Sequence, residues 1–325
     1  MKLEFLMQNR FLLGNVFLKS QFSEKRFHLL RYGEYVSDEQ IADYQKRNLN
    51  DFEYEPVITS EHYLPWFNLL NEIKHGIEDS VKMARFVRGL QIFYIDNFLK
   101  KELSEVDILS MIEGNIRVFG QGRGRQIIQD FLKSNIILFK RQAFLASSCM
   151  IPLFIMGHDD FKFLEDVFVT ILLCNHSLWD FHTIQSDRSI SYYHQHPLSV
   201  EKKDLLKQNS DKLLFDFEQV VSQPLYPYEY DSVAEFIVRH HEWCISEKGS
   251  FNPSLINDWM GTIFFFDLIV PYHYEKHFHF SSILKSLNHE QQQILHGLHK
   301  IVYFFRDQLG VDVFSKLGMK KLESA

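Results

Sequence analysis

Glycines and arginines alternate in the stretch Gly120-Gln121-Gly122-Arg123-Gly124-Arg125, whose composition is unlike that of an ordinary helix or core segment. Alternating glycines allow positive φ and a close approach of the backbone to a ligand, and a helix that starts after them offers free N–H groups to an anion. The pattern predicts a phosphate-binding loop, for a nucleotide or a nucleic-acid backbone, made by Arg117, Gly120, Gly122, Arg123, Gly124 and Arg125.

This loop matches neither of the common phosphate-binding motifs. No Gly-Lys-Ser/Thr follows it, as a P-loop requires, and no strand of a parallel sheet is expected before it, as a dinucleotide-binding motif requires. A Gly-rich turn with solvated arginines is the competing interpretation. Other cations of the chain could extend a basic surface around the loop, namely Lys82, Arg85, Arg88, Lys133, Lys140 and Arg141.

Histidines are the second candidate, because six of the 16 lie between residues 273 and 299. His273 and His277 are four residues apart, the spacing at which one helix offers two ligands to a metal ion. His296 and His299 could complete such a site from the next helix. Hydrogen-bonded histidines on a core face explain the same spacing, so metal binding by these four residues is kept as an alternative.

Arg188 and His194 form a third candidate, because they fit the loose R-x4-6-H motif. In this motif the chain resembles the HEPN helical ribonucleases, in which the arginine and the histidine support attack by the 2′-hydroxyl of RNA. The resemblance implies an RNA-cleaving activity carried by Arg188 and His194. A motif this short occurs by chance in a chain rich in both residue types, and Pro197 leaves little room for the helix that carries it.

The acidic stretch His158-Asp159-Asp160 offers a weaker candidate. Its His-Asp pair resembles that of the metal-dependent HD phosphohydrolases, which are helical, but the nearest upstream histidine is His75, much too far away for that family's pattern. Carboxylates at this place are also typical of a helix N-terminus, where they interact favourably with the helix dipole. We therefore expect an ordinary helix start.

Composition limits the class of protein. The 325 residues are 46% hydrophobic with 31 Phe, which supplies ample core material, and the net charge of −7 argues against wholesale coating of nucleic acid. Three distant cysteines predict reduced, buried thiols in the cytoplasm. The apolar run from Ala143 to Gly157 falls short of the roughly 20 residues needed to span a bilayer. We expect neither an export signal nor a membrane contact.

Helical patterns dominate the elements that must position these candidates. Ser37-Asp38-Glu39-Gln40 has the form of a capping box, a clear apolar stripe begins at Ser80, and Ser104 caps a helix expected to end near Gly114. Further helices are expected over residues 126–144, 161–181 (as the buried central helix), 253–270 and 288–310. Short apolar bursts before residue 36 leave strand and helix unresolved, with a hairpin around Gly14-Asn15 as one option.

These elements predict an all-α protein of about ten helices, with room for a small β element near the N-terminus. We expect an N-terminal helical region over residues 1–119 and a helical core domain over residues 120–325. The favoured function is a soluble intracellular interaction module, a subunit or adaptor that requires no cofactor. It would bind a protein partner, and nucleic acid or a phosphorylated ligand through the Gly/Arg loop. The alternative is a helical hydrolase acting on RNA or nucleotides.

Overall fold

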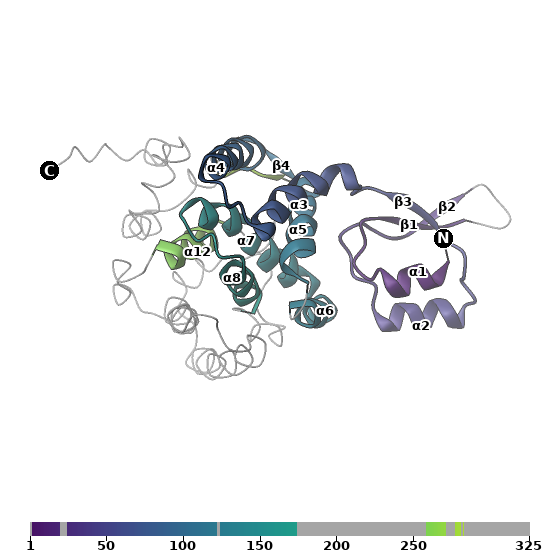
Figure 1. Ribbon diagram of the computed structural model, residues 1–325. Helices are drawn as coiled ribbons and strands as arrows, with labels where there is room; N and C mark the ends of the chain where they lie inside the picture. Colours follow the sequence, from purple (N-terminus) through teal and green to yellow (C-terminus); the bar gives the residue numbers. More distant parts are fainter. Residues whose placement is uncertain are drawn as a thin grey trace.

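The computed structural model describes residues 2–19, 25–121, 124–173, 258–270, 277–280 and 282. Within these residues the chain forms a small N-terminal lobe (residues 2–56) and a larger helical body that begins at Ile58. Figure 1 shows the lobe to one side of the body, linked to it by the chain between β3 and α3. The described part is therefore mostly helical, as predicted, and carries one small antiparallel sheet near the N-terminus.

The N-terminal lobe folds two short helices onto one side of a three-stranded antiparallel sheet with the strand order β2-β1-β3. Its hairpin strands β1 and β2 pair Val16 with Leu30, while Val16 also lies opposite Tyr54 of β3. The capping box at Ser37 is present: its hydroxyl accepts from the N–H of Gln40, whose side chain accepts from the N–H of Ser37. The elements in chain order are α1 (Leu3–Gln8), β1 (Gly14–Lys19), β2 (Arg26–Leu30), α2 (Asp38–Lys46) and β3 (Glu53–Pro56).

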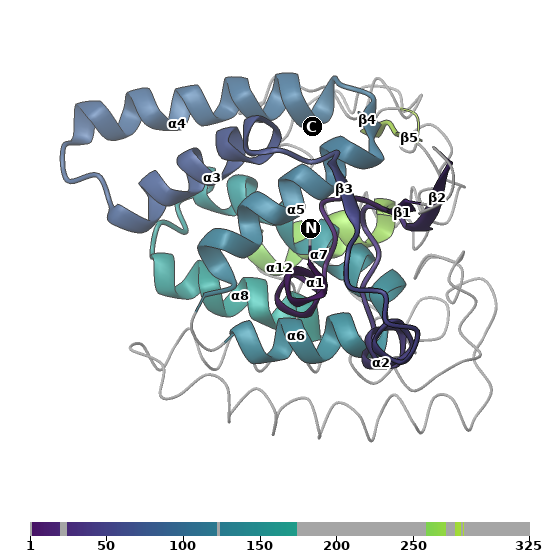
Figure 2. The same cartoon turned by 90° about the vertical axis from the view of Figure 1, so that its right-hand side faces the viewer.

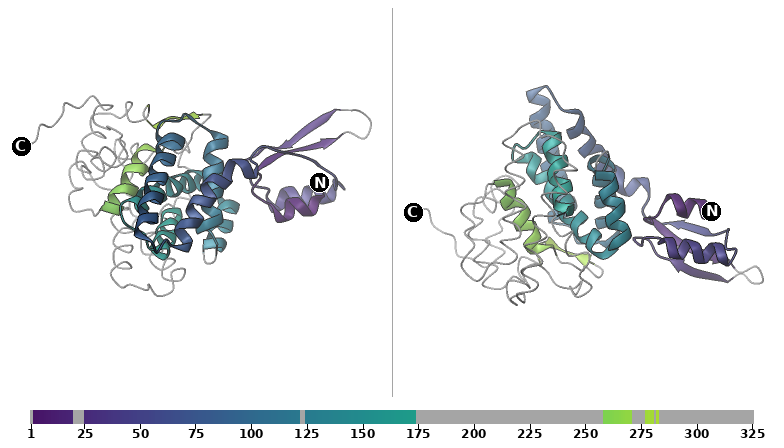
Figure 3. Two further views of the ribbon diagram at one scale, coloured as in Figure 1. Left: turned by 45° about the horizontal axis from the view of Figure 1, so that its top comes forward. Right: turned by 90° about the horizontal axis from the view of Figure 1, so that it is seen from below.

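The helical body is built around α7 (Ile136–Ile155), which contacts helices α4, α5, α6, α8 and α12. Figures 2 and 3 show these helices gathered around it, with α4 along the outer edge. Two-residue strands β4 and β5 pair Leu103 with Phe278. The remaining bounds are α3 (Ser60–His75), α4 (Ser80–Tyr94), the π-helical turn η1 (Ile95–Leu99), β4 (Leu103–Ser104), α5 (Glu105–Phe119), α6 (Gly124–Ser134), α8 (Phe161–Leu173), α12 (Asp258–Ile269) and β5 (His277–Phe278).

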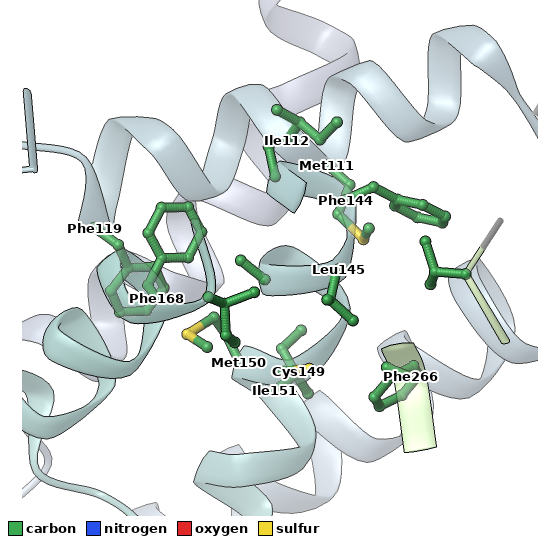
Figure 4. Close-up of a cluster of buried hydrophobic side chains, with 14 of the residues drawn as sticks. Met111, Ile112, Phe119, Phe144, Leu145, Cys149, Met150, Ile151, Phe168 and Phe266 are labelled. Atoms are coloured by element: carbon green, nitrogen blue, oxygen red, sulfur yellow. The ribbon is translucent and has the colours of Figure 1, made fainter. Parts of the chain in front are cut away.

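The central helix is α7 rather than the predicted segment 161–181. Its side chains from Leu138 to Phe154 are buried with the sole exception of the partly buried Lys140. Figure 4 shows Phe144, Leu145 and Met150 of α7 among buried side chains of neighbouring helices. By length and composition α7 could cross a membrane, but 83% of its apolar window is buried inside the protein. Its apolarity is therefore explained by its place in the core.

Aromatic side chains fill much of this core. Phe98 lies within 6.1 Å, between ring centroids, of the rings of Tyr94, Phe144, Phe266, Phe278 and Phe280. In the described part of the chain, Phe5 and Phe27 are the large aromatic hydrophobics that stay exposed. The phenylalanines of the described residues are thus used mainly for packing, because ring pairs and buried area together stabilise a core.

Two predicted helix boundaries are wrong for identifiable reasons. The helix expected to end near Gly114 continues to Phe119, because Gly114 packs against α3 and does not cap the helix. The helix expected over residues 126–144 is divided into α6 and α7 at Asn135, whose side-chain oxygen accepts from the N–H of Leu138 over 3.0 Å and starts a new helix.

The buried hydrophobic side chains of the described residues form two clusters, one running from Leu3 to Phe52 and one from Ile58 to Phe280. The division predicted at residues 119 and 120 lies between α5 and α6, which both contribute to the larger cluster. At the junction of lobe and body, Glu105 accepts from Arg31 of the lobe over 2.7 Å and from Lys140 of α7 over 3.4 Å. Burial lowers the pKa of Lys140, and Glu105 opposes that shift.

Glu105→Gln is therefore expected to lower the free energy of unfolding by about 1–3 kcal/mol, because it leaves the mostly buried Lys140 ammonium without its carboxylate. Urea denaturation measures this change. The matched control is Asp51→Asn, which removes the carboxylate of an exposed pair with Lys2 and is expected to leave the unfolding midpoint unchanged. Equal effects of the two substitutions would contradict the role given to Glu105.

Candidate cationic surface

The predicted Gly/Arg loop connects α5 to α6, and its first glycine is used for packing. A Cβ atom on Gly120 would lie 2.6 Å from both the carbonyl oxygen of Ile116 and the Cδ1 atom of Ile128. Gly120 thus lets the end of α5 approach α6 closely, a structural role that accounts for this glycine by itself. Gly124 is the first residue of α6, and Gly122 and Arg123 lie outside the described residues.

The arginines of the loop differ in whether their guanidinium groups already have partners within the protein. Arg117 donates to Glu113 over 2.7 Å, and its guanidinium lies over the ring of Tyr63 at 4.5 Å. The Arg125 side chain is exposed and forms neither a hydrogen bond nor an ion pair within the described part of the chain. Of the predicted phosphate ligands that the structure describes, Arg125 therefore retains the guanidinium that is freest to bind an anion.

A more concentrated set of free cations lies on α4. Lys82, Arg85 and Arg88 are exposed, and none of them pairs with a carboxylate among the residues that the structure describes. Residues 80–94 of α4 contain no Asp or Glu, and the carboxylate of the N-cap residue Asp79 accepts from backbone N–H groups. We name the exposed side of this helix the α4 outer face; its residues are Val81, Lys82, Ala84, Arg85, Arg88, Gly89 and Ile92.

The opposite side of α4 packs against the helical body, so the α4 outer face is directed toward solvent. Phe86 meets Phe154 of α7 with ring centroids 5.9 Å apart, and Phe93 meets Trp66 of α3 at 4.8 Å. The buried Tyr94 donates its hydroxyl to the carbonyl oxygen of Ser148 over 2.7 Å. At the other end, the Asp79 carboxylate accepts from two N–H groups of the first turn. The helix is thus held at both ends, and its cations point outward.

Three of the cations expected to extend a basic surface are not available there. Lys133 pairs with Asp38 over 2.8 Å and Lys140 with Glu105. The expectation for Arg141 is wrong, because this side chain is fully buried and forms an ion pair with Asp267 of α12. No local pattern around Arg141 signals this pair, since its partner lies far away in the sequence.

The pair of Arg141 and Asp267 belongs to a buried polar group in the core. Arg141 also donates to the carbonyl oxygen of Asp267 over 2.9 Å and to the side chain of Gln142 over 2.7 Å. Burial and the nearby Asp267 carboxylate raise the pKa of the Cys149 thiol, which keeps this thiol protonated and unreactive. We assign this group a structural role, because its hydrogen bonds link α7 to the carbonyl oxygens of Asp267 and Val270 and, through Gln142, to the carbonyl oxygen of Ile171 in α8.

The metal and nuclease candidates lie mostly outside the described residues: this holds for Arg188, His194, His273, His296 and His299. His277 belongs to β5, where it pairs with Ser104, and so does not lie on a helix as the metal prediction assumed. Within the described ranges, no group of three His, Cys, Asp or Glu side chains could hold a metal ion. Asp160 accepts from the N–H of Phe163 over 2.9 Å, as expected for a carboxylate at the start of a helix.

Comparison with known proteins adds no functional clue, because no protein family model, no curated protein and no solved structure matches the chain.

Proposed function

We propose that this protein is a non-catalytic helical interaction module, an intracellular subunit or adaptor, that binds a negatively charged macromolecule on the α4 outer face. The observation that carries the proposal is that Lys82, Arg85 and Arg88 are exposed together without carboxylate partners among the described residues. Elsewhere on the described surface, cations such as Lys133 and Arg117 are held by carboxylates.

The spacing of these cations suits an extended anionic partner. Residues 82 to 88 rise about 9 Å along the helix, so the three charges lie in a row rather than around a point. A partner that runs along this row would displace counterions from its own charges, which makes binding favourable and dependent on salt. Arg125 is a second, weaker anion contact in this proposal, and Gly122 and Arg123 remain predicted parts of it.

The triple variant Lys82→Ala, Arg85→Ala and Arg88→Ala tests the proposal with two labelled probes, single-stranded oligouridylate and polyglutamate. For oligouridylate, we expect the slope of log K against log salt to become shallower by about 2, since three phosphate contacts are lost. Fluorescence anisotropy over a salt series measures the slope.

The matched control is Lys2→Ala, Arg47→Ala and Lys100→Ala, which removes the same net charge from exposed cations that are paired with carboxylates. This control is expected to keep most of the slope of the unmodified protein. If the slope of log K against log salt falls equally in both variants, net charge alone governs binding, and the role assigned to the α4 outer face is wrong.

A further inference from the structure

Two exposed aliphatic side chains accompany the cations of α4. Val81 and Ile92 are 59% and 54% exposed, values that stand out for residues of a helix whose other large apolar side chains pack inward. Val81, Arg85, Arg88 and Ile92 are spaced by four, three and four residues, the spacing of the contact positions in a coiled coil. They form one straight seam, which is apolar at its ends and cationic between them.

Gly89 lies beside this seam in the middle of α4, where glycine weakens a helix. A Cβ atom at Gly89 would meet nothing within 4 Å, so no neighbour in the structure requires its absence. Gly114 is different: a Cβ there would lie 2.7 Å from the Cβ of Trp66. A glycine at an exposed helix position is explained if the backbone of a partner molecule packs closely against it.

We infer that the partner of the α4 outer face is an acidic amphipathic helix of another protein. Apolar side chains of this helix cover Val81 and Ile92, its carboxylates meet Arg85 and Arg88, and its backbone passes closest at Gly89. This inference rests on the proposed function and names the class of partner. A nucleic-acid backbone would meet the cations but would gain nothing from the apolar ends of the seam or from Gly89.

The test uses the full chain and a labelled helical peptide of about three heptads, with leucines at the positions facing the ends of the seam and glutamates between them. A peptide of the same composition in scrambled order is the reference. We expect the patterned peptide to bind about tenfold more tightly than the scrambled one, because it alone buries the two aliphatic side chains. Oligouridylate should displace it only weakly.

Two variants probe the seam apart from its charge. Val81→Ser with Ile92→Ser is expected to cost about tenfold in affinity for the patterned peptide and nothing for the scrambled one. Gly89→Gln is expected to lower the affinity for the patterned peptide to a similar degree. Because glutamine favours a helix more than glycine does, this variant also stabilises α4, so misfolding cannot explain the lower affinity. Ile137→Ser, which changes an exposed aliphatic residue at the start of α7, is the control and should bind as the unmodified protein does.

The outcomes separate this inference from the proposed function. One outcome is that the triple cation variant loses the same affinity for both peptides while the seam variants bind the patterned peptide as the unmodified protein does. In that case the surface recognises charge alone, and the acidic helix is rejected as the partner. If the triple cation variant binds every probe normally, the proposed function itself is refuted. Stronger binding of oligouridylate than of the patterned peptide would overturn the inference in favour of nucleic acid. Self-association lost in Gly89→Gln would overturn it in favour of a second copy.

Discussion

Replacing Arg141 with methionine is expected to lower the free energy of unfolding by about 3–5 kcal/mol, because it removes one partner of the buried ion pair with Asp267. Both side chains are fully buried, so water cannot replace the lost partner. The same substitution also removes donors to the carbonyl oxygens of Asp267 and Val270. Urea denaturation followed by circular dichroism measures the loss.

The double variant Arg141→Met with Asp267→Leu is the control for this prediction. Since both charges are then absent, most of the lost stability is expected to return, as when a buried ion pair is replaced by apolar side chains of similar volume. If the single variant loses less than about 1 kcal/mol, the pair does not join α7 to α12 in the way described.

Replacing Gly114 with leucine is expected to cost about 3 kcal/mol, the second large effect, because α5 and α3 leave no room for a side chain there. A Cβ at this position would already lie 2.7 Å from the Cβ of Trp66 and 3.1 Å from the N atom of Phe67. Relief would require the two helices to separate, which would also disturb the packing of Trp66 on Phe93.

Gly89→Ala is the matched control for the glycine prediction, since it places a Cβ atom in open space on another helix. Alanine favours the helix by up to about 1 kcal/mol over glycine at an exposed interior position, so this variant should be slightly more stable. A thermal melt compares the two variants directly. If Gly114→Leu unfolds at the temperature of the unmodified protein, the close crossing of α3 and α5 is wrong.

Local signals predicted the elements that are decided locally. The capping box at Ser37 and the apolar stripe that begins at Ser80 specify α2 and the start of α4 within a few residues each, so the sequence predicted them well. The three-stranded sheet does not follow from the sequence, because its short strands carry no periodicity that separates strand from helix. The helix end predicted at Gly114 is wrong because a glycine signals a helix end and a close helix crossing equally well.

The candidate site depends on contacts that no local pattern contains. The composition of the Gly/Arg loop is conspicuous, yet Gly120 is needed for packing and Arg117 is held by Glu113. The cations of α4 could be placed on one side of a helix from their spacing alone. That no carboxylate of another described element reaches them is a property of the tertiary structure, as is the burial of Arg141 beside Asp267.

The most direct test of the α4 outer face as the anion contact is to locate a bound polyanion by chemical cross-linking. A water-soluble carbodiimide joins a carboxylate to a lysine amine that touches it, so polyglutamate bound to the full chain can be linked in place and the linked lysine found by mass spectrometry. We expect Lys82 to be linked first, ahead of the exposed Lys46 and Lys74, and salt added before the coupling to prevent the link from forming. Links at Lys46 or Lys74 with Lys82 unmodified would contradict this prediction.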